Sequence, residues 1–343
     1  MSKTFKVAVV GAGRMGNHHA RTYAGMDRCE LVAVVDHDID RARKVAGDHG
    51  GRALSSIDQI TEDLDAATVA VPTVHHAEAA IPLMERGVAV LVEKPLAPDS
   101  TAAGQLLEAS RANKCLLQVG HSERFNPVVQ ALLRLGITPQ FIETDRISPF
   151  TFRSADVGVV FDMMIHDIDI ILHLVRQREY EVDAVGVNVL GDCEDVANAR
   201  IRFTNGSVVN MTASRLALKT ERKIRIFSPS AYLTMDYQKK TGIAIKLDDN
   251  LDLIRMARER NFDDLSQMQG LDYGSMINVE PLKVDDVDAL QAEVGAFLDS
   301  LDTGGEAGVS AEDGVAAVVM AERITEAVKQ HDWGHSLPEV VHP

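Results

Sequence analysis

Short apolar runs and helical stretches alternate over the first third of the chain. Runs typical of buried strands span residues 5–10, 30–36, 67–71, 88–92 and 115–119, and apolar residues recur at helical spacing over 15–26, 39–48, 75–86 and 100–112. Parallel strands need helical crossovers, so this order predicts a doubly wound parallel sheet with helices on both faces. We expect an α/β domain over residues 1–122, with ligands at the carboxyl ends of its strands.

The pattern changes after residue 122, where strand-like runs follow one another more closely. They span 141–147, 182–190, 195–203, 207–214, 222–228 and 231–236, with helical spacing at 126–135, 158–172, 285–301 and 311–329. We therefore predict a second, α+β domain over residues 123–343. Residues 239–280 mix polar and scattered apolar positions. We interpret them as an inserted arm that covers the substrate or reaches a neighbouring subunit; a solvated surface helix is the alternative.

Length and composition agree with two ordinary globular domains. The chain has 343 residues, of which 45% are hydrophobic and 25% charged. No apolar run approaches the roughly 18 residues of a membrane span, and no signal peptide is evident. Three scattered cysteines form neither a disulfide framework nor a metal-ligand motif. We expect a cytoplasmic protein that binds no metal.

The net charge of −16 limits the partners. Nucleic acids and anionic membranes attract basic surfaces, so neither is expected as a partner. An anionic ligand must instead be held by local cations and by the amino ends of helices, against the overall field of the protein.

A glycine-rich turn follows the first apolar run. Gly11, Gly13 and Gly16 have the spacing of a dinucleotide-binding loop and lie between a strand pattern and a helix pattern. Gly11 permits the tight turn, Gly13 lets the backbone approach a pyrophosphate, and Gly16 lets the helix pack closely on the strand. Arg14 and Met15 complete the loop as candidate cofactor contacts.

Asp36 ends the second apolar run. A carboxylate there can accept hydrogen bonds from a ribose diol and repels a 2′-phosphate, so NAD is favoured over NADP. The alternative for the whole unit is an ordinary glycine-rich strand-to-helix turn.

Polar residues follow two later strands. Pro72, Thr73 and His76 are expected near the adenosine and phosphate half of the cofactor. Glu93 and Lys94, pinned by a proline, place two charges at the end of an apolar strand, which is costly unless they are exposed or used. A solvated strand end is the alternative.

Asp162 and His166 lie four residues apart in the helical stretch 158–172. This spacing projects both from one face of a helix, where the carboxylate can accept a hydrogen bond from the imidazole and support it as a base. The alternative is a helix with an incidental Asp and His.

Taken together, these motifs resemble those of the Gfo/Idh/MocA family of glucose-fructose-oxidoreductase-like and inositol-dehydrogenase-like proteins. The resemblance covers nearly the whole chain and rests on Asp36 and on GAGRMG (11–16), VPTVHHAE (71–78), VEKPL (92–96) and GHSERFNP (120–127). It implies an open, mostly antiparallel sheet in the second domain and an active site between the domains. It also implies a homodimer or homotetramer.

The resemblance further implies a catalytic set. Asp162 and His166 match the family's G-x-x-x-D-x-x-x-H helix, so we expect His166 as general base, oriented by Asp162. Lys94 is expected to bind the substrate hydroxyl and stabilise the developing alkoxide, although Lys94 and His166 could exchange roles. Glu93 is expected at the nicotinamide ribose.

The expected substrate is a nucleotide sugar. The predicted insertion, the ERFNP motif (123–127) and a basic cluster resemble family members that oxidise UDP-N-acetylhexosamines at C3 ahead of amination, as in lipopolysaccharide or lipid A biosynthesis. The cluster consists of Arg215, Lys219, Arg222 and Lys223 and could hold a diphosphate; an ordinary charged hairpin edge is equally compatible. We expect Glu123, Arg124, Asn126 and Arg215 to bind substrate. The alternatives are an inositol or free-sugar dehydrogenase, an NAD-dependent glycosidase and a non-catalytic dinucleotide sensor.

Overall fold

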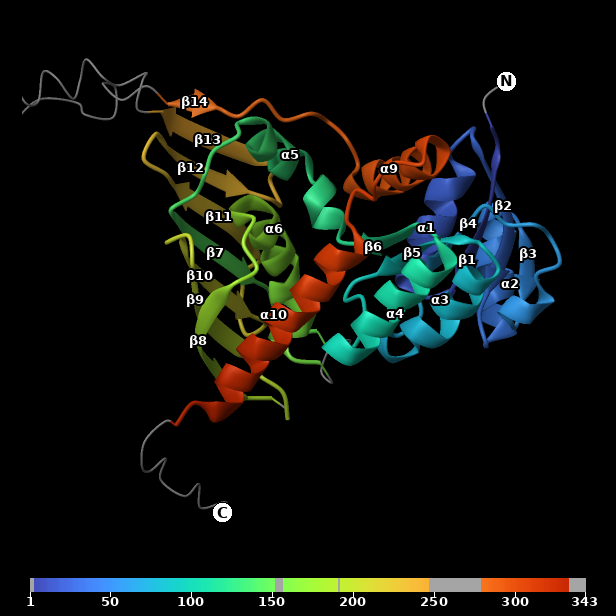
Figure 1. Ribbon diagram of the computed structural model, residues 1–343, viewed down its shortest axis with the longest axis horizontal. Coiled ribbons are helices and arrows are strands. Elements are labelled where there is room, and N and C mark those ends of the chain that lie inside the picture. The colour runs from blue at the N-terminus through green and yellow to red at the C-terminus, as the bar shows by residue number, and fades with distance from the viewer. Residues whose placement is uncertain (1–2, 152–156, 191, 247–278, 333–343) are drawn as a thin grey trace, which may run out of the picture.

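Six parallel strands form the sheet of the N-terminal domain, in the order β3-β2-β1-β4-β5-β6 (Figure 1). The computed structural model describes residues 3–151, 157–190, 192–246 and 279–332. The strand order β3-β2-β1-β4-β5-β6 is that of a doubly wound dinucleotide-binding sheet, as predicted. The strands are β1 (Phe5–Val10), β2 (Cys29–Val35), β3 (Arg52–Leu54), β4 (Ala66–Val69), β5 (Ala89–Glu93) and β6 (Leu117–Gly120), and the helices between them are α1 (Arg14–Ala24), α2 (Ile39–His49), α3 (His76–Glu85) and α4 (Ser100–Asn113).

The edge strand β3 was not predicted from the sequence. It has three residues, and none of them is fully buried. A strand this short at a sheet edge needs no apolar run, so the hydrophobic pattern carries no signal for it.

Eight strands form the sheet of the second domain, in the order β14-β13-β12-β11-β7-β10-β9-β8. The β7–β10 pair is parallel and the other pairs are antiparallel, which confirms the predicted open, mostly antiparallel sheet. The strands are β7 (Phe141–Ile147), β8 (Tyr180–Val187), β9 (Val196–Phe203), β10 (Val208–Ser214), β11 (Glu221–Phe227), β12 (Ala231–Asp236), β13 (Thr241–Lys246) and β14 (Glu280–Pro281). Helices α5 (Pro127–Arg134), α6 (Ile165–Val175) and α10 (Ala311–Gln330) lie together along this sheet in Figure 1 and share its core.

The interpretation of residues 239–280 as an inserted arm needs correction at both ends. Thr241–Lys246 pairs with β12 along its whole length, and Glu280–Pro281 pairs with β13, so both segments belong to the sheet. Residues 247–278 lie outside the described residues.

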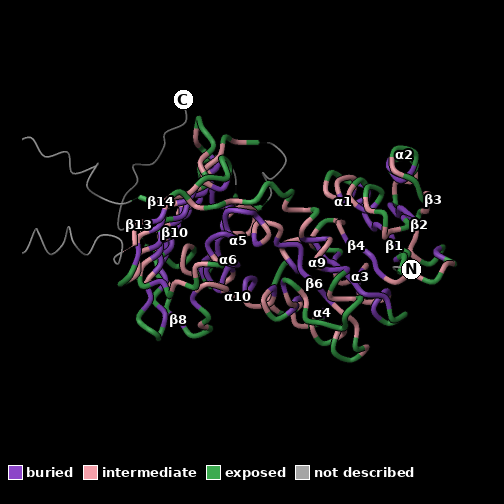
Figure 2. The backbone as a smooth tube through the Cα atoms, turned by 90° about the horizontal axis from the view of Figure 1, so that it is seen from above, coloured by how far each residue is buried: buried purple, intermediate pink, exposed green. Residues whose placement is uncertain are grey.

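Helix α9 (Ala289–Thr303) packs on the first domain, although the sequence pattern placed it in the second. Val294, Phe297 and Leu298 are buried in one core with the strands of the parallel sheet. Arg28, which precedes β2, donates hydrogen bonds to Asp299 and to the Gly295 carbonyl oxygen of α9. The buried positions in Figure 2 follow the strands of both sheets and the helices packed on them. The carboxyl-terminal part of the chain thus completes the amino-terminal domain.

Helix α10 contacts both domains. Val318 lies in a core of the first domain, while Met320, Ala321 and Ile324 lie in the core of the second. Its first turn carries Glu312 and Asp313, and Ser310 caps it through the Asp313 N–H. None of the helices in the described part of the chain is both long and apolar enough to cross a bilayer.

Candidate active site

A cavity of about 1270 Å³ joins the glycine loop of the first domain to the sheet of the second. It exceeds the roughly 300–1,000 Å³ of a typical small-molecule pocket. The first domain contributes Gly11, Gly13, Arg14, Met15, Asp36, Pro72, Thr73, His76, Glu93 and Lys94 to its lining, and the second contributes Arg146, Ser148, Asp162, His166, Arg215 and Arg222. All of the predicted cofactor residues except Gly16 therefore line one cavity.

The glycines of the loop are required by geometry. Gly11 has a φ of +100°, and a Cβ at Gly16 would lie 1.6 Å from the Gly11 carbonyl oxygen, so neither position has room for a side chain. A Cβ at Gly13 would meet no atom within 4 Å, since this glycine faces the cavity. Gly13 also precedes α1 without a side-chain cap, which leaves N–H groups of the first turn available to an anion. The loop fits a pyrophosphate.

Asp36 is held rigidly at the end of β2. Its Oδ2 accepts a hydrogen bond from the Ala12 N–H at 2.7 Å, and its Oδ1 accepts one from the Asp38 N–H at 2.9 Å. The side chain is almost wholly buried yet lines the cavity. This is the placement expected of a carboxylate that binds a ribose diol.

His76 lines the cavity but also joins two loops. Its Nδ1 lies 3.1 Å from the Leu96 carbonyl oxygen and its Nε2 lies 3.0 Å from that of Val71. Burial lowers the pKa of this imidazole, although the two carbonyl groups act in the opposite direction. The side chain thus ties the turn after β4 to the turn after β5.

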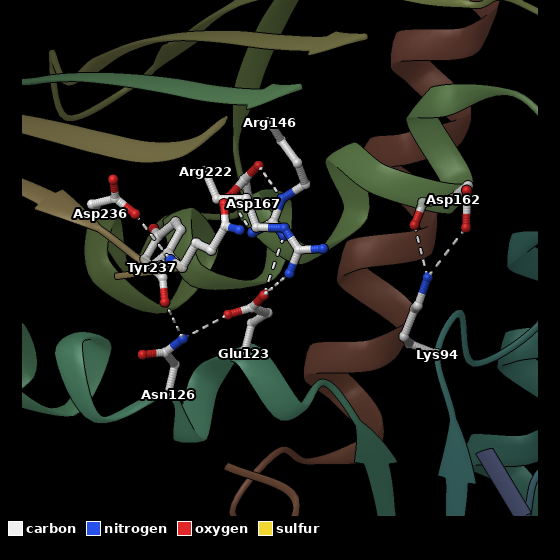
Figure 3. A network of polar contacts seen from close by, with 10 residues as sticks. Lys94, Glu123, Asn126, Arg146, Asp162, Asp167, Arg222, Asp236 and Tyr237 are labelled. Carbon is white, nitrogen blue, oxygen red and sulfur yellow. Dashed lines mark hydrogen bonds and ion pairs between the residues drawn. The ribbon is translucent and has the colours of Figure 1, made fainter. Parts of the chain in front are cut away.

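Lys94 reaches from the end of β5 to the second domain. Its Nζ donates a hydrogen bond to the Asp162 carbonyl oxygen at 2.7 Å and lies 3.6 Å from Asp162 Oδ1 (Figure 3). One fifth of the side chain is exposed, within the cavity. Burial lowers the pKa of Lys94, while the carboxylates of Asp162 and Glu93 oppose that shift.

The predicted hydrogen bond between Asp162 and His166 does not form. Asp162 lies in a π-helical turn, Val160–Met164, and it contacts Lys94, while Nδ1 of His166 is buried with no partner among the described residues. The prediction assumed α-helical geometry from 158 to 172, and a π-helical turn changes the direction of its side chains. The structure thus pairs Asp162 with the lysine rather than with the histidine.

The surroundings of His166 favour its neutral form. Burial lowers the pKa of the imidazole well below its usual value, and the positive charges of Lys94 and Arg146 lower it further. A neutral imidazole can accept a proton. The surroundings of His166 therefore suit a group that accepts a proton.

Three of the four predicted substrate residues do not line the cavity. Arg124 is buried and bonded to Asp169 of α6 and Asp313 of α10. Asn126 caps α5 through the Val128 N–H, and Glu123 accepts hydrogen bonds from Asn126 and Arg146. Buried charges need such partners. Arg124 therefore faces α6 and α10, whereas Glu123 faces the strand arginines Arg146 and Arg222.

Arg146 is a cavity residue that sequence reasoning missed. It projects from β7, where it forms two hydrogen bonds with Asp167 at 2.8 and 2.9 Å and one with Glu123 at 3.2 Å (Figure 3). Residues on β7 alternate between buried and half-buried, and Arg146 occupies a buried position. The sequence offers no clear signal for this placement, because the buried positions of β7 are Ile142, Thr144 and Arg146, which form no apolar stripe.

The predicted basic cluster is divided by the structure. Arg215 and Arg222 line the cavity, whereas Lys219 and Lys223 do not. Arg215 is buried, with Nε 2.5 Å from Asp195 Oδ1 and Nη1 2.7 Å from the Val157 carbonyl oxygen. Arg222 lies 3.4 Å from Glu123 and keeps 45% of its side chain exposed. Arg146, Arg215 and Arg222 are therefore the arginines in the part of the cavity that the second domain forms, the candidate substrate half.

Comparison with known proteins matches both domains to one family. Residues 5–121 match the family model described as the oxidoreductase family, NAD-binding Rossmann fold, and residues 139–233 match the GFO/IDH/MocA C-terminal domain. The chain belongs to the Gfo/Idh/MocA oxidoreductase family. The match of the first domain to an NAD-binding Rossmann fold supports a nicotinamide dinucleotide as the cofactor.

Several family members are similar over most of the chain. The UDP-N-acetylglucosamine 3-dehydrogenase of Acidithiobacillus ferrooxidans is 35% identical over 237 residues, which cover 69% of this chain and 75% of that protein. Its solved structure superposes with a TM-score of 0.83 at 29% identity and covers 95% of this chain and 98% of that one. The inositol 2-dehydrogenase of Rhizobium meliloti is 26% identical over 345 residues, with 95% and 98% covered. These relatives are dehydrogenases by name.

Proposed function

We propose that the protein oxidises the C3 hydroxyl of UDP-N-acetylglucosamine, with NAD as the hydride acceptor. The observation that carries this proposal is the continuation of the cavity beyond Lys94 into a section lined by Arg146, Arg215 and Arg222. A diphosphate is best bound by arginines, and a free polyol has no group that requires three of them. The 35% identical relative named for this reaction supports the same choice.

The residues at the centre of the cavity suit an alcohol oxidation. Bound NAD supplies an acceptor for the hydride that leaves the sugar carbon, and the hydroxyl proton must go to the protein. Neutral His166 accepts this proton. Lys94 donates a hydrogen bond to the sugar oxygen and stabilises the negative charge that develops there. Asp162 takes a role different from the one expected, because it holds Lys94.

The cations of the substrate half are matched by nearby carboxylates. Arg146 contacts Asp167 and Glu123, and Arg222 contacts Glu123, so the arginines are held in place before substrate arrives. Preorganised guanidinium groups lose little freedom when a phosphate binds. In a protein with a net charge of −16, these guanidinium groups offer an anionic substrate local N–H donors that the overall field of the protein does not supply.

A substrate panel tests the proposal. The protein is incubated with NAD or NADP and with UDP-N-acetylglucosamine, UDP-glucose, myo-inositol or glucose, and NADH or NADPH formation is followed by absorbance. We expect the highest kcat/KM for UDP-N-acetylglucosamine with NAD, and reduction of the product with borodeuteride should place deuterium at C3. Turnover of myo-inositol alone would refute the nucleotide sugar. Release of free sugar from an aryl glycoside would indicate a glycosidase, and cofactor binding without any turnover would indicate a sensor.

A 3-keto sugar is the kind of product that an aminotransferase consumes, so we propose that the reaction precedes an amination, as in the synthesis of an amino sugar for lipid A.

We also propose a homodimer or homotetramer formed through the face of the second sheet that bears Asn198, Arg200, Asn210 and Thr212. These side chains form cross-strand hydrogen bonds of 3.0 and 2.9 Å. Light scattering of the native protein and of an Arg200→Glu variant tests this; a native monomer would refute it.

A further inference from the structure

Glu293 is a buried carboxyl group that the proposed reaction does not use. It lies on α9 and is wholly inaccessible to solvent. Both of its carboxyl oxygens lack a hydrogen-bond partner among the described residues. An unpaired buried carboxyl group is costly, so its presence beneath an active site calls for a specific role.

Its nearest titratable neighbours belong to the active site. One ligand atom each of His19, Glu93 and Glu293 lies within 4.8 Å of the other two, and the three side chains form the one such cluster in the described parts of the chain. His19 on α1 forms a hydrogen bond with Glu93, with 2.7 Å between Nε2 and Oε1. The second oxygen of Glu93 accepts a hydrogen bond from the Lys94 N–H at 3.2 Å. Glu93 thus connects Glu293 to the catalytic lysine.

Two adjacent carboxylates in a dry site cannot both be ionised at low cost. Glu93 is the better anion, because His19 and Lys94 both stabilise its charge. Burial raises the pKa of Glu93, but the hydrogen bond with His19 and the charge of Lys94 outweigh it, so the net shift is downward. For Glu293, burial raises the pKa well above its usual value, and the charges of Glu93 and of Asp169 on α6 act in the same direction. Glu293 is the group that keeps the proton.

Resting on the proposed reaction, we propose that Glu293 is a positioning residue that stays protonated beside Glu93, so that the pair carries one negative charge, rather than two, next to Lys94. The other groups that face it support this. Tyr23 of α1 is bonded to Thr68 at 2.9 Å, and Gln118 of β6 donates to the Glu293 backbone carbonyl oxygen at 3.1 Å, so neither neutralises the carboxyl group. Ionisation of Glu293 would add a second anion beside Glu93. Its field would offset the positive charge of Lys94 and weaken the stabilisation of the developing alkoxide.

A divalent metal held by the same three side chains is the competing explanation. Zinc ligands of this kind lie about 2.1 Å from the ion, which places neighbouring ligand atoms of a tetrahedral site about 3.4 Å apart. The 2.7 Å between His19 and Glu93 is a hydrogen-bond distance and is too short for that arrangement. The geometry of the three side chains therefore favours a protonated Glu293 over a bound metal ion.

Infrared spectroscopy tests the proton directly and does not depend on the substrate. The difference spectrum between the native protein and Glu293→Gln should contain the carbonyl stretch of a protonated carboxylic acid at neutral pH, and this band should vanish at alkaline pH. Absence of the band at neutral pH would overturn the proposal. So would a stoichiometric divalent metal, measured by mass spectrometry in the native protein and lost from Glu293→Gln.

Kinetics test the positioning role. Glu293→Leu places an apolar side chain beside the Glu93 carboxylate and should lower kcat/KM about tenfold, whereas Glu293→Gln keeps a neutral polar group there and should rescue most of that loss. The kcat/KM of the native protein should decline at alkaline pH as Glu293 ionises. The Gln variant should lack this decline. Equal losses of kcat/KM in the Gln and Leu variants, or a Leu variant with the native pH profile of kcat/KM, would contradict the positioning role.

Glu322→Gln is the matched control for a helix glutamate between the domains. Glu322 lies on α10, and its carboxylate accepts a hydrogen bond from the Ser100 N–H. Thermal unfolding shows whether each variant folds, and NADH binding measured by fluorescence reports on the site even if UDP-sugars are not oxidised.

Discussion

The two halves of the cavity are built in different ways. The cofactor half depends on backbone. Gly13 leaves space, the uncapped start of α1 offers N–H groups, and Asp36 follows closely in sequence. The substrate half depends on long side chains from β7, β11 and the end of β10, and Arg146, Arg215 and Arg222 all contact carboxylates. An added side-chain atom should therefore weaken binding in the cofactor half, and a lost side-chain charge should weaken binding in the substrate half.

Lys94 lies between the halves, and its loss should have the largest effect. Lys94→Met should lower kcat about 10²- to 10⁴-fold, because both the hydrogen bond to the sugar oxygen and the stabilising charge disappear. NADH binding, measured by fluorescence, should remain close to native. A variant with near-native kcat would show that the chemistry depends on His166 alone.

An added methyl group should break the cofactor half. In Gly16→Ala the new Cβ would lie 1.6 Å from the Gly11 carbonyl oxygen, so the loop must shift. Overpacking of this kind costs about 1–3 kcal/mol, equivalent to roughly a five- to 150-fold weaker Kd for NADH if the loop bears the cost. Isothermal titration measures the Kd, and Gly47→Ala, on α2 with no atom within 4 Å of the new Cβ, is the control. Equal NADH affinity in both variants would contradict this account of the loop.

A lost charge should test the substrate half. Arg222→Gln should raise the KM for UDP-N-acetylglucosamine about tenfold and leave the KM for NAD near native, because one charge-assisted hydrogen bond to the diphosphate disappears. Arg225→Gln is the control on the same strand, since Arg225 pairs with Glu143 and Asp145 and does not line the cavity. If both variants behave alike, the diphosphate binds elsewhere.

The pH profile should show the smallest change and should identify the base. A base must be unprotonated to act, so kcat/KM falls as the pH drops below its pKa. Because burial and nearby cations hold the pKa of His166 well below 6.5, activity should stay level through neutrality and decline only at more acidic pH. His166→Asn should remove this decline. An acid-side decline that begins above neutrality would identify Lys94 as the base instead.

Local signals in the sequence predicted the first domain well. The strand and helix pattern indicated the doubly wound sheet, and the family motifs selected residues that line the cavity, including Glu93, Lys94 and His166. The predictions failed where the bonding partners of a side chain are distant from it in sequence. Arg124 lies in a motif full of polar residues, but its charge is paired with Asp169 and Asp313, which are far away in sequence. Arg146 was missed for the converse reason, since nothing near it in sequence indicates that β7 faces the cavity.

The sequence by itself determined the dinucleotide loop, the alternation of strands and helices, and the position of the lysine after β5. These features depend on backbone conformation and on short-range periodicity, which neighbouring residues control. The tertiary structure alone decided that Asp162 contacts Lys94, that three arginines line the substrate half, and that α9 brings Glu293 beneath Glu93. The physical reason is that a buried charge takes whichever partner the packing brings close, and the packing depends on the whole chain.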